Sequence, residues 1–178
     1  MNRADHTIPQ LLAEFDRAKA YTDSLWADLT VDEVHWRPHD NFSPIGWHLG
    51  HQAAISHFMV RNLTAAEPSL DPQLDLLMDS ATPEVGRGAL PDLDRLRSYR
   101  DTAAERLHVR MDNIADCRVS APQQLQRIAV GLITAVTNHE YQHSQWIGEV
   151  REQDLGHALP DRPTSDLLTL INGYLMIV

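Results

Sequence analysis

The sequence predicts an all-α protein, a four-helix bundle with a long connection between its second and third helices. Apolar residues recur at helical spacing over four long segments, and no convincing alternating strand pattern precedes residue 165. A segment containing prolines and glycines, residues 64–90, separates the second helix from the third. Four amphipathic helices with one long crossover are typical of a four-helix bundle.

The first helix is expected over residues 8–29. Its apolar positions and their small neighbours keep helical spacing: Leu11, Leu12, Phe15, Ala18, Thr22, Leu25 and Trp26. Thr30-Val-Asp-Glu33 then has the spelling of a capping box, in which the Thr30 hydroxyl accepts from the Glu33 amide and Glu33 reaches back. It opens a short turn that Arg37-Pro38 closes.

The second helix is expected to begin with Ser43 as N-cap and Pro44 at the first helical position, and to end near Leu63. The connection over residues 64–90 is expected to hold one turn around residues 74–78. A connection of this length is unusual unless it covers a site.

Pro91-Asp92 opens the third helix, and the fourth runs from about Pro122 to Gln153. The last segment, LLTLINGYLMIV, fits either a helix or a strand. We expect one domain over residues 1–178, with the bundle over about 8–155 and a tail over 156–178.

Composition excludes several classes of function. A formal net charge of −10, without a basic stripe, makes nucleic acid an unexpected partner. The single Cys117 excludes an intramolecular disulfide and a thiolate-rich zinc site. The N-terminal MNRADHTIPQ lacks the apolar core of a signal peptide, and no apolar run is long enough for a membrane span. We therefore expect a cytoplasmic protein that does not enter the membrane.

The sequence NHEYQH, residues 138–143, places two histidines on the fourth helix. His139 and His143 continue its apolar line, which runs through Leu125, Ile128, Leu132, Val136, Trp146 and Val150. Positions four apart on a helix differ by roughly 40° and lie about 6 Å apart, so two imidazoles can share one metal ion. Glu140 lies about 100° from His139, as a residue behind the ligands or facing solvent.

A third ligand is expected from the second helix, where His48 and His51 both lie on apolar faces. Periodicity does not choose between them. The remaining histidines are expected on the surface or in loops: His6, His35, His39, His57, His108 and His157.

The spelling H-E-x-x-H also belongs to zinc peptidases, in which Glu140 would be the general base. Those enzymes set the helix against a sheet, which is not predicted here. Their third ligand usually lies downstream, and neither Glu149 nor His157 stands at a recognised spacing. A peptidase is therefore the less favoured alternative.

Together, LTVDEVHWRPHDNFSPIGWHLGHQAA, RGALP with Tyr99 nine residues after Leu90, and NHEYQH resemble the DinB/YfiT-like superfamily. Within it they most resemble the DinB-type domain at the N-terminus of ergothioneine- and ovothiol-type sulfoxide synthases. The resemblance implies a bundle that binds one divalent ion through one histidine of the second helix and two of the fourth. The synthase pattern S-P-x-x-W-x-L-x-H falls on Ser43, Pro44, Trp47, Leu49 and His51. The resemblance thus selects His51, with His139 and His143, as the metal ligands.

The chain departs from the synthases at Gln145, where they usually have a glutamate two residues after the last ligand. They also continue into a second, larger domain, so a partner subunit of a split synthase is one alternative. A dimer contact is the plainer role for the tail, and the resemblance suggests a homodimer.

Single-domain relatives include transferases and isomerases that use low-molecular-weight thiols, and metal-dependent hydrolases. Three neutral imidazoles suit zinc, nickel, iron or copper; we expect zinc, nickel or iron. The leading hypothesis is a metal-dependent transferase or hydrolase that acts on a small polar substrate, such as a low-molecular-weight thiol. The alternative is a bundle in which the ion only links two helices.

Overall fold

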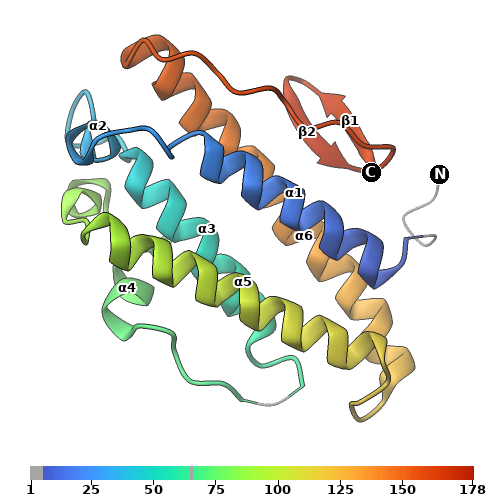
Figure 1. Cartoon of the computed structure of the whole chain (residues 1–178). Coiled ribbons are helices and arrows are strands. Elements are labelled where there is room, and N and C mark those ends of the chain that lie inside the picture. The colour runs from blue at the N-terminus through green and yellow to red at the C-terminus, as the bar shows by residue number, and fades with distance from the viewer. Residues whose placement is uncertain (1–5, 65) are drawn as a thin grey trace. The chain divides into compact units, whose positions relative to one another are not determined.

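The computed structural model describes residues 6–64 and 66–178, and it is mostly helical with one small sheet (Figure 1). Its four long helices match the four predicted segments: α1 (Ile8–Ser24), α3 (Ile45–Val60), α5 (Leu93–Ala115) and α6 (Pro122–Glu149). Shorter elements lie between or after them: α2 (Val31–His35), α4 (Pro72–Leu77), the 3₁₀ helix η2 (Glu84–Gly88), the π-helical turn η3 (Val150–Asp154), β1 (Leu168–Ile171) and β2 (Tyr174–Ile177).

The chain divides into two compact units. One contains the described residues up to Leu25 together with His108–Val178, and the other contains Trp26–Leu107. Helix α5 begins in the second unit and continues into the first. The single domain over residues 1–178 stays a prediction.

In the first unit, α1 packs against α6 (Figure 1). Both capping-box hydrogen bonds are present at the start of α1, where the side chains of Thr7 and Gln10 each accept from the other residue's backbone amide. The helix ends at Ser24, earlier than the predicted Leu29, and Leu25 is its C-cap. Arg151 Nη1 donates to the Leu25 carbonyl oxygen at 3.0 Å. A terminal carbonyl is thus satisfied without further helix.

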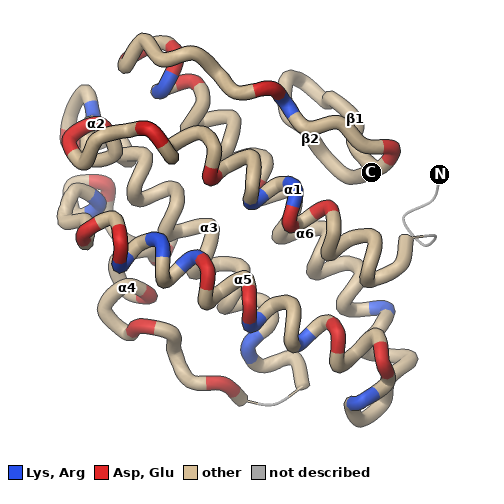
Figure 2. The backbone as a smooth tube through the Cα atoms, viewed as in Figure 1, with Lys and Arg blue, Asp and Glu red and all other residues tan. Residues whose placement is uncertain are grey.

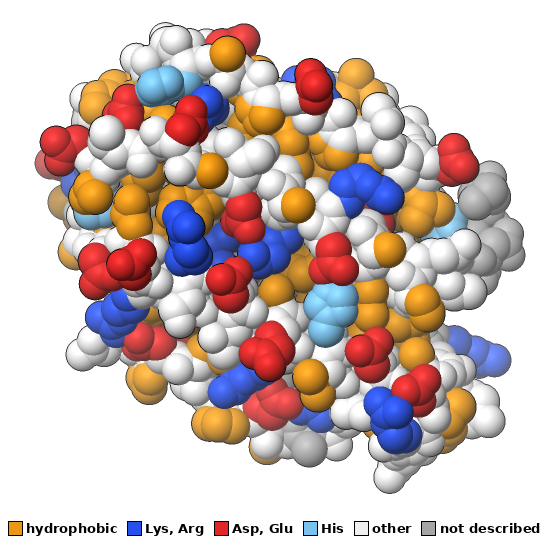
Figure 3. All heavy atoms as spheres, viewed as in Figure 1, with side chains coloured by type: hydrophobic (Ala, Val, Ile, Leu, Met, Phe, Trp, Pro, Cys, Tyr) orange, Lys and Arg blue, Asp and Glu red, His pale blue; other side chains and the backbone are white. Residues whose placement is uncertain are grey.

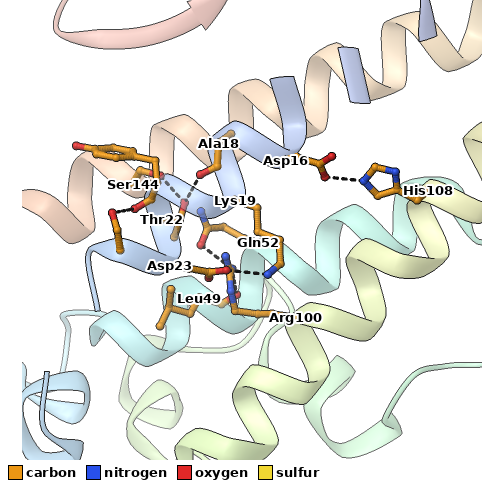
Figure 4. A network of polar contacts seen from close by, with 12 residues as sticks. Asp16, Ala18, Lys19, Thr22, Asp23, Leu49, Gln52, Arg100, His108 and Ser144 are labelled. Carbon is orange, nitrogen blue, oxygen red and sulfur yellow. Dashed lines mark hydrogen bonds and ion pairs between the residues drawn. The ribbon is translucent and has the colours of Figure 1, made fainter. Parts of the chain in front are cut away.

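A hydroxyl pair joins α1 to α6. Thr22 Oγ1 and Ser144 Oγ lie 2.6 Å apart, and each hydroxyl also donates to a carbonyl one turn back on its own helix, that of Ala18 and that of Glu140 (Figure 4). One of the two shares its hydrogen between both acceptors. Both side chains are buried, so the pair satisfies polar groups that would otherwise lack water.

Glu14 is a buried carboxylate on α1 with three donors around it. Tyr141 Oη donates to its Oε1 and Ser165 Oγ to its Oε2, each at 2.7 Å, and Arg17 forms an ion pair with it. Only 1% of Glu14 is exposed. Burial, with the hydrogen bond to Glu14 and its charge, raises the pKa of Tyr141 well above its ordinary value. The phenol therefore remains a donor, and Ser165 ties the C-terminal segment to α1.

Tyr141→Phe is expected to lower the free energy of unfolding by about 1.5–3 kcal/mol, because a buried carboxylate loses a hydrogen bond. Urea denaturation measures this as a lower midpoint with an unchanged slope. Ser165→Ala, at a half-buried position, is expected to cost about 1 kcal/mol. An unchanged midpoint in Tyr141→Phe would contradict this role for Glu14.

The last segment, which fitted either helix or strand, forms an antiparallel hairpin. Leu168 pairs with Ile177 and Ile171 with Tyr174. The two turn residues, Asn172 and Gly173, have φ values of 50° and 90°. Asn-Gly with two positive φ angles is the favoured two-residue hairpin turn, so the turn residues select the strand.

In the second unit, the predicted capping box of α2 is confirmed. The Glu33 amide donates to Thr30 Oγ1 at 3.3 Å, and Thr30 N donates to the Glu33 carboxylate at 2.8 Å. The predicted start of α3 is wrong by one residue. Pro44 is the N-cap, while Ser43 accepts from Arg87 Nη1 at 2.8 Å and makes no cap bond. The helix ends at Val60, before the predicted Leu63.

The predicted turn in the 64–90 connection is α4, and Asp71 caps it by accepting from the amides of Gln73 and Leu74. Arg37 holds the part of the connection that follows α4. Arg37 Nη1 donates to the carbonyl oxygens of Asp40 and Glu84, both at 3.0 Å. The connection is therefore attached to the segment that precedes α3.

Charged residues occur along most of the length of α5 (Figure 2). On the face shown in Figure 3, acidic and basic side chains are mixed, with apolar side chains between them. Among the described residues, no helix is both long enough and apolar enough to cross a membrane. The expectation that nucleic acid is not a partner stays a prediction.

Candidate metal centre

His51 lies on α3 with only 5% of its surface exposed. Its Nδ1 lies 2.7 Å from the carbonyl oxygen of Met78, just after α4. A carbonyl oxygen only accepts, so Nδ1 carries the hydrogen and Nε2 carries the lone pair. Metal-binding histidines commonly donate their second nitrogen to such a carbonyl.

Trp47 holds the His51 ring on one side. The two rings stack at 4.5 Å with 10° between their planes. The indole Nε1 donates to the Leu77 carbonyl at 3.0 Å. Successive carbonyls at the end of α4, those of Leu77 and Met78, therefore position two neighbouring rings of α3.

Arg87 lies over Trp47, with its guanidinium carbon 3.9 Å from the ring centroid. It also donates to Ser43 Oγ and, at 3.0 and 3.2 Å, to the carbonyls of Thr82 and Ser80. The arginine of RGALP thus links the connection to the start of α3. Lysine could not replace Arg87 here, because its ammonium group lacks the planar guanidinium that stacks on the ring and donates several hydrogen bonds at the same time.

Gly50 allows Met78 to approach α3. A Cβ atom at residue 50 would lie 2.4 Å from Met78 Sδ, and Met78 is fully buried. Any larger residue would therefore displace the side chain of Met78, whose own carbonyl accepts from His51.

The surroundings keep His51 neutral. Burial lowers the pKa of His51 below its ordinary value, and the charge of Arg87 acts in the same direction. The hydrogen bond with Met78 and the charge of Asp79 oppose this shift without reversing it. A neutral imidazole is the form that binds a metal ion.

His139 and His143 are one turn apart on α6, as predicted. Their ring centroids lie 4.4 Å apart, with 56° between the planes. His143 is 4% exposed and packs edge-on against Trp146 at 4.8 Å, while His139 is half-buried. The helix thus supplies two imidazoles from one side.

The buried side of α6 is wider than the predicted line and extends to positions one residue further along. On that line Val136, His143 and Val150 are buried, whereas Ile128 is 48% exposed. The positions one residue further along are buried as well: Ala129, Ile133, Glu140, Ser144 and Ile147. Of the two alternatives for Glu140, behind the ligands or facing solvent, the solvent-facing one is wrong, because only 3% of it is exposed. His139 falls at the margin of this side, since neighbouring positions differ by about 100°.

Asn138 fastens β2 to α6. Its Nδ2 donates to the Ile177 carbonyl at 3.1 Å, and its Oδ1 accepts from the Ile177 amide at 2.7 Å. One amide side chain thus takes the place of a neighbouring strand. No local pattern indicates this role, because the partner of Asn138 lies 39 residues away.

Asn138→Ala is expected to release β2, because two hydrogen bonds of roughly 1 kcal/mol each are lost. Exchange of the Ile177 amide should rise about ten- to a hundredfold, measured by hydrogen exchange. Asn138→Asp retains the acceptor and should give a smaller rise. Equal protection in all three proteins would show that Asn138 does not hold the strand.

The three predicted ligands form a group. One nitrogen each from His51, His139 and His143 lies within 4.8 Å of the others. Two of the three side chains are buried, and His51 has the tautomer in which Nε2 carries the lone pair. Three imidazoles are a donor set that suits a borderline transition-metal ion, so these residues fit one.

The other histidines do not join this group. His48 is buried as well, packing edge-on against Trp47 at 5.5 Å. The expectation of a surface or loop position is wrong for His57, which lies on α3 and is 1% exposed. His6 lies in the segment before α1, as expected of a loop histidine, although it is only 7% exposed. His57 is covered because Arg106 and Glu67 lie beside it, at 3.4 and 3.9 Å. His39 is exposed, and the rest are half-buried: His35, His108 and His157.

The sequence profile of the DinB superfamily matches residues 14–147, three quarters of the chain. The chain belongs to the DinB superfamily. The matched segment contains all three histidines of the group. A search of curated proteins finds no match.

Gln145 stands where the synthase pattern has glutamate. Its Nε2 donates to Glu149 Oε1 at 3.0 Å, and its Oε1 accepts from Arg162 at 3.3 Å. In this DinB-superfamily chain the position therefore links α6 to the segment that follows it.

Proposed function

We propose that this DinB-superfamily chain is an enzyme that binds one divalent transition-metal ion through His51, His139 and His143. The observation that carries the proposal is the group of three nitrogens within 4.8 Å of one another. The superfamily match supports it, since DinB-like proteins bind divalent metals. We further propose that α1, α3, α5 and α6 form one four-helix bundle, as the resemblance implies.

The reaction class that we propose is thiol transfer or hydrolysis on a small polar substrate. An ion held by three protein ligands supplies open positions at which the pKa of a bound thiol or water is lowered. The chain's own contribution is to keep His51 neutral and oriented through Met78 and Trp47.

A non-catalytic role is the second candidate, in which the ion only links α3 to α6. Its binding free energy would then add to the stability of the fold.

Metal analysis and turnover separate the two candidates. Protein purified without chelators is expected to contain about one ion per chain. Loaded with zinc, nickel or iron, it should consume a low-molecular-weight thiol or hydrolyse a small ester or amide, and chelation should stop this. Bound metal with earlier melting on chelation, but no turnover with any of these ions, would favour the linking role. Absence of bound metal would overturn both.

A further inference from the structure

A pocket of about 380 Å³ opens beside His139 in the first unit. It is lined from two elements: Ala135, Asn138, His139 and Gln142 of α6, and Tyr174 and Met176 of β2. Its volume lies at the lower end of the range for small-molecule sites. The C-terminal hairpin is therefore one wall of a cavity that one of the three grouped histidines also lines.

The pocket lining is uncharged apart from the imidazole. Of its six residues none is Asp, Glu, Lys or Arg. Ala135, Met176 and the Tyr174 ring offer apolar surface, and Gln142 and Asn138 bring amides. A charged group placed here would lose water without gaining an ion pair, which is unfavourable.

Two features keep the pocket in shape. Asn138 binds both backbone groups of Ile177, so β2 stays against α6. Ser165, just before the hairpin, binds Glu14 on α1. The hairpin is therefore held at the end where Leu168 pairs with Ile177, independently of any ligand.

We propose that this pocket is the substrate site, and that it takes the uncharged, largely apolar tail of a small thiol whose sulfur points toward His139. The inference rests on the proposed function, and it adds that the substrate carries its polar head at the metal and its apolar end against β2. Tyr174 and Met176 are then specificity-determining residues.

The test uses the full-length chain loaded with cobalt(II), whose visible spectrum changes when a thiolate binds. Affinity for ethanethiol, propanethiol and butanethiol is expected to rise about fourfold for each added methylene that becomes buried. Isopentyl thiol should bind at least tenfold more tightly than β-mercaptopropionate, which has the same shape but a charged end. Equal affinities across the alkyl series, or tighter binding of the charged thiol, would overturn the proposal.

Variants locate the effect. Ala135 is exposed, so Ala135→Trp fills the pocket without entering the core. It should remove the dependence on chain length while affinity for ethanethiol changes less than about twofold. Tyr174→Ala should weaken the dependence, and Leu170→Ala, at an exposed position of β1, should preserve it. A full dependence on chain length in both Ala135→Trp and Tyr174→Ala would place the tail elsewhere.

A readout without metal distinguishes this inference from the proposed function. The methyl group of Met176, identified among the five methionines through Met176→Leu, is followed by NMR during titration of metal-free protein with butanethiol. A saturable shift supports the pocket whether or not the protein binds metal. Absence of metal binding would contradict only the proposed function. No shift, in protein whose cobalt spectrum does respond to thiols, overturns the pocket.

Discussion

His51→Ala is expected to lower the affinity for zinc at least about a hundredfold. Loss of an outer partner of a metal ligand typically costs 10–100-fold, and loss of a ligand itself costs more. His51 is the one member of the group on α3, and its buried ring is already oriented by Met78. Without it, the two imidazoles of α6 would have to hold the ion alone.

Competition with a chromophoric chelator measures the affinity, and His48→Ala is the matched control. His48 is three residues away on the same helix and also buried, but it does not belong to the group. It is expected to cost stability through lost packing while zinc affinity stays within a few-fold. If the two variants bind zinc equally well, the assignment of His51 is wrong.

Gly50→Ala is expected to have the second largest effect. Its Cβ would meet three atoms of Met78 at 2.4–2.8 Å, and a buried side chain in a packed core has little room to move. Overpacking of this kind typically costs about 1–3 kcal/mol. Because the Met78 carbonyl accepts from His51, zinc affinity should also fall by about tenfold or more.

The control is a second helical glycine. A Cβ atom at Gly131 of α6 would meet nothing within 4 Å. Gly131→Ala is therefore expected to stabilise the protein by up to about 1 kcal/mol, through helix propensity alone. Thermal or urea unfolding compares the two variants. A stabilised Gly50→Ala with wild-type zinc affinity would show that the close approach of Met78 is not needed.

The two glycines show that the effect of a glycine-to-alanine substitution depends on what packs against the helix at that position. Both lie within long helices, and in the sequence both read as a local cost to helix stability. Only the packing of Met78, a residue of the long connection, separates them. The connection was expected to cover a site, and in the structure its contribution is specific: two carbonyls that orient His51 and Trp47.

Helix periodicity predicted the positions of the helices well, but it predicted less well which side of each helix is buried. The four long segments, the Thr30 capping box and the turn before Met78 follow from local spacing and local hydrogen bonds. On α6 the predicted apolar line was only partly right: Val136 is buried, but Ile128 is exposed, and Glu140, which is not on the line, is buried. An apolar stripe is about 100° wide, and a single step around the helix is just as large.

Local capping rules failed where a distant partner competed. Ser43 before Pro44 has the spelling of a helix start, yet its hydroxyl binds Arg87, 44 residues away. Asn138, which precedes the histidine pair in the sequence, holds the last strand. Neither partner could be identified from neighbouring residues.

The sequence by itself determined the helical elements, the Asn-Gly turn and the pair of histidines one turn apart, because each depends on residues within about four positions of one another. It also carried the pattern that resembles the DinB superfamily, which selected His51 over His48. Only the tertiary structure decided which carbonyl fixes the His51 tautomer, that Glu140 is buried, and that β2 and α6 enclose a pocket beside His139. These features join residues tens of positions apart, and such pairings are set by packing of the folded chain rather than by local propensity.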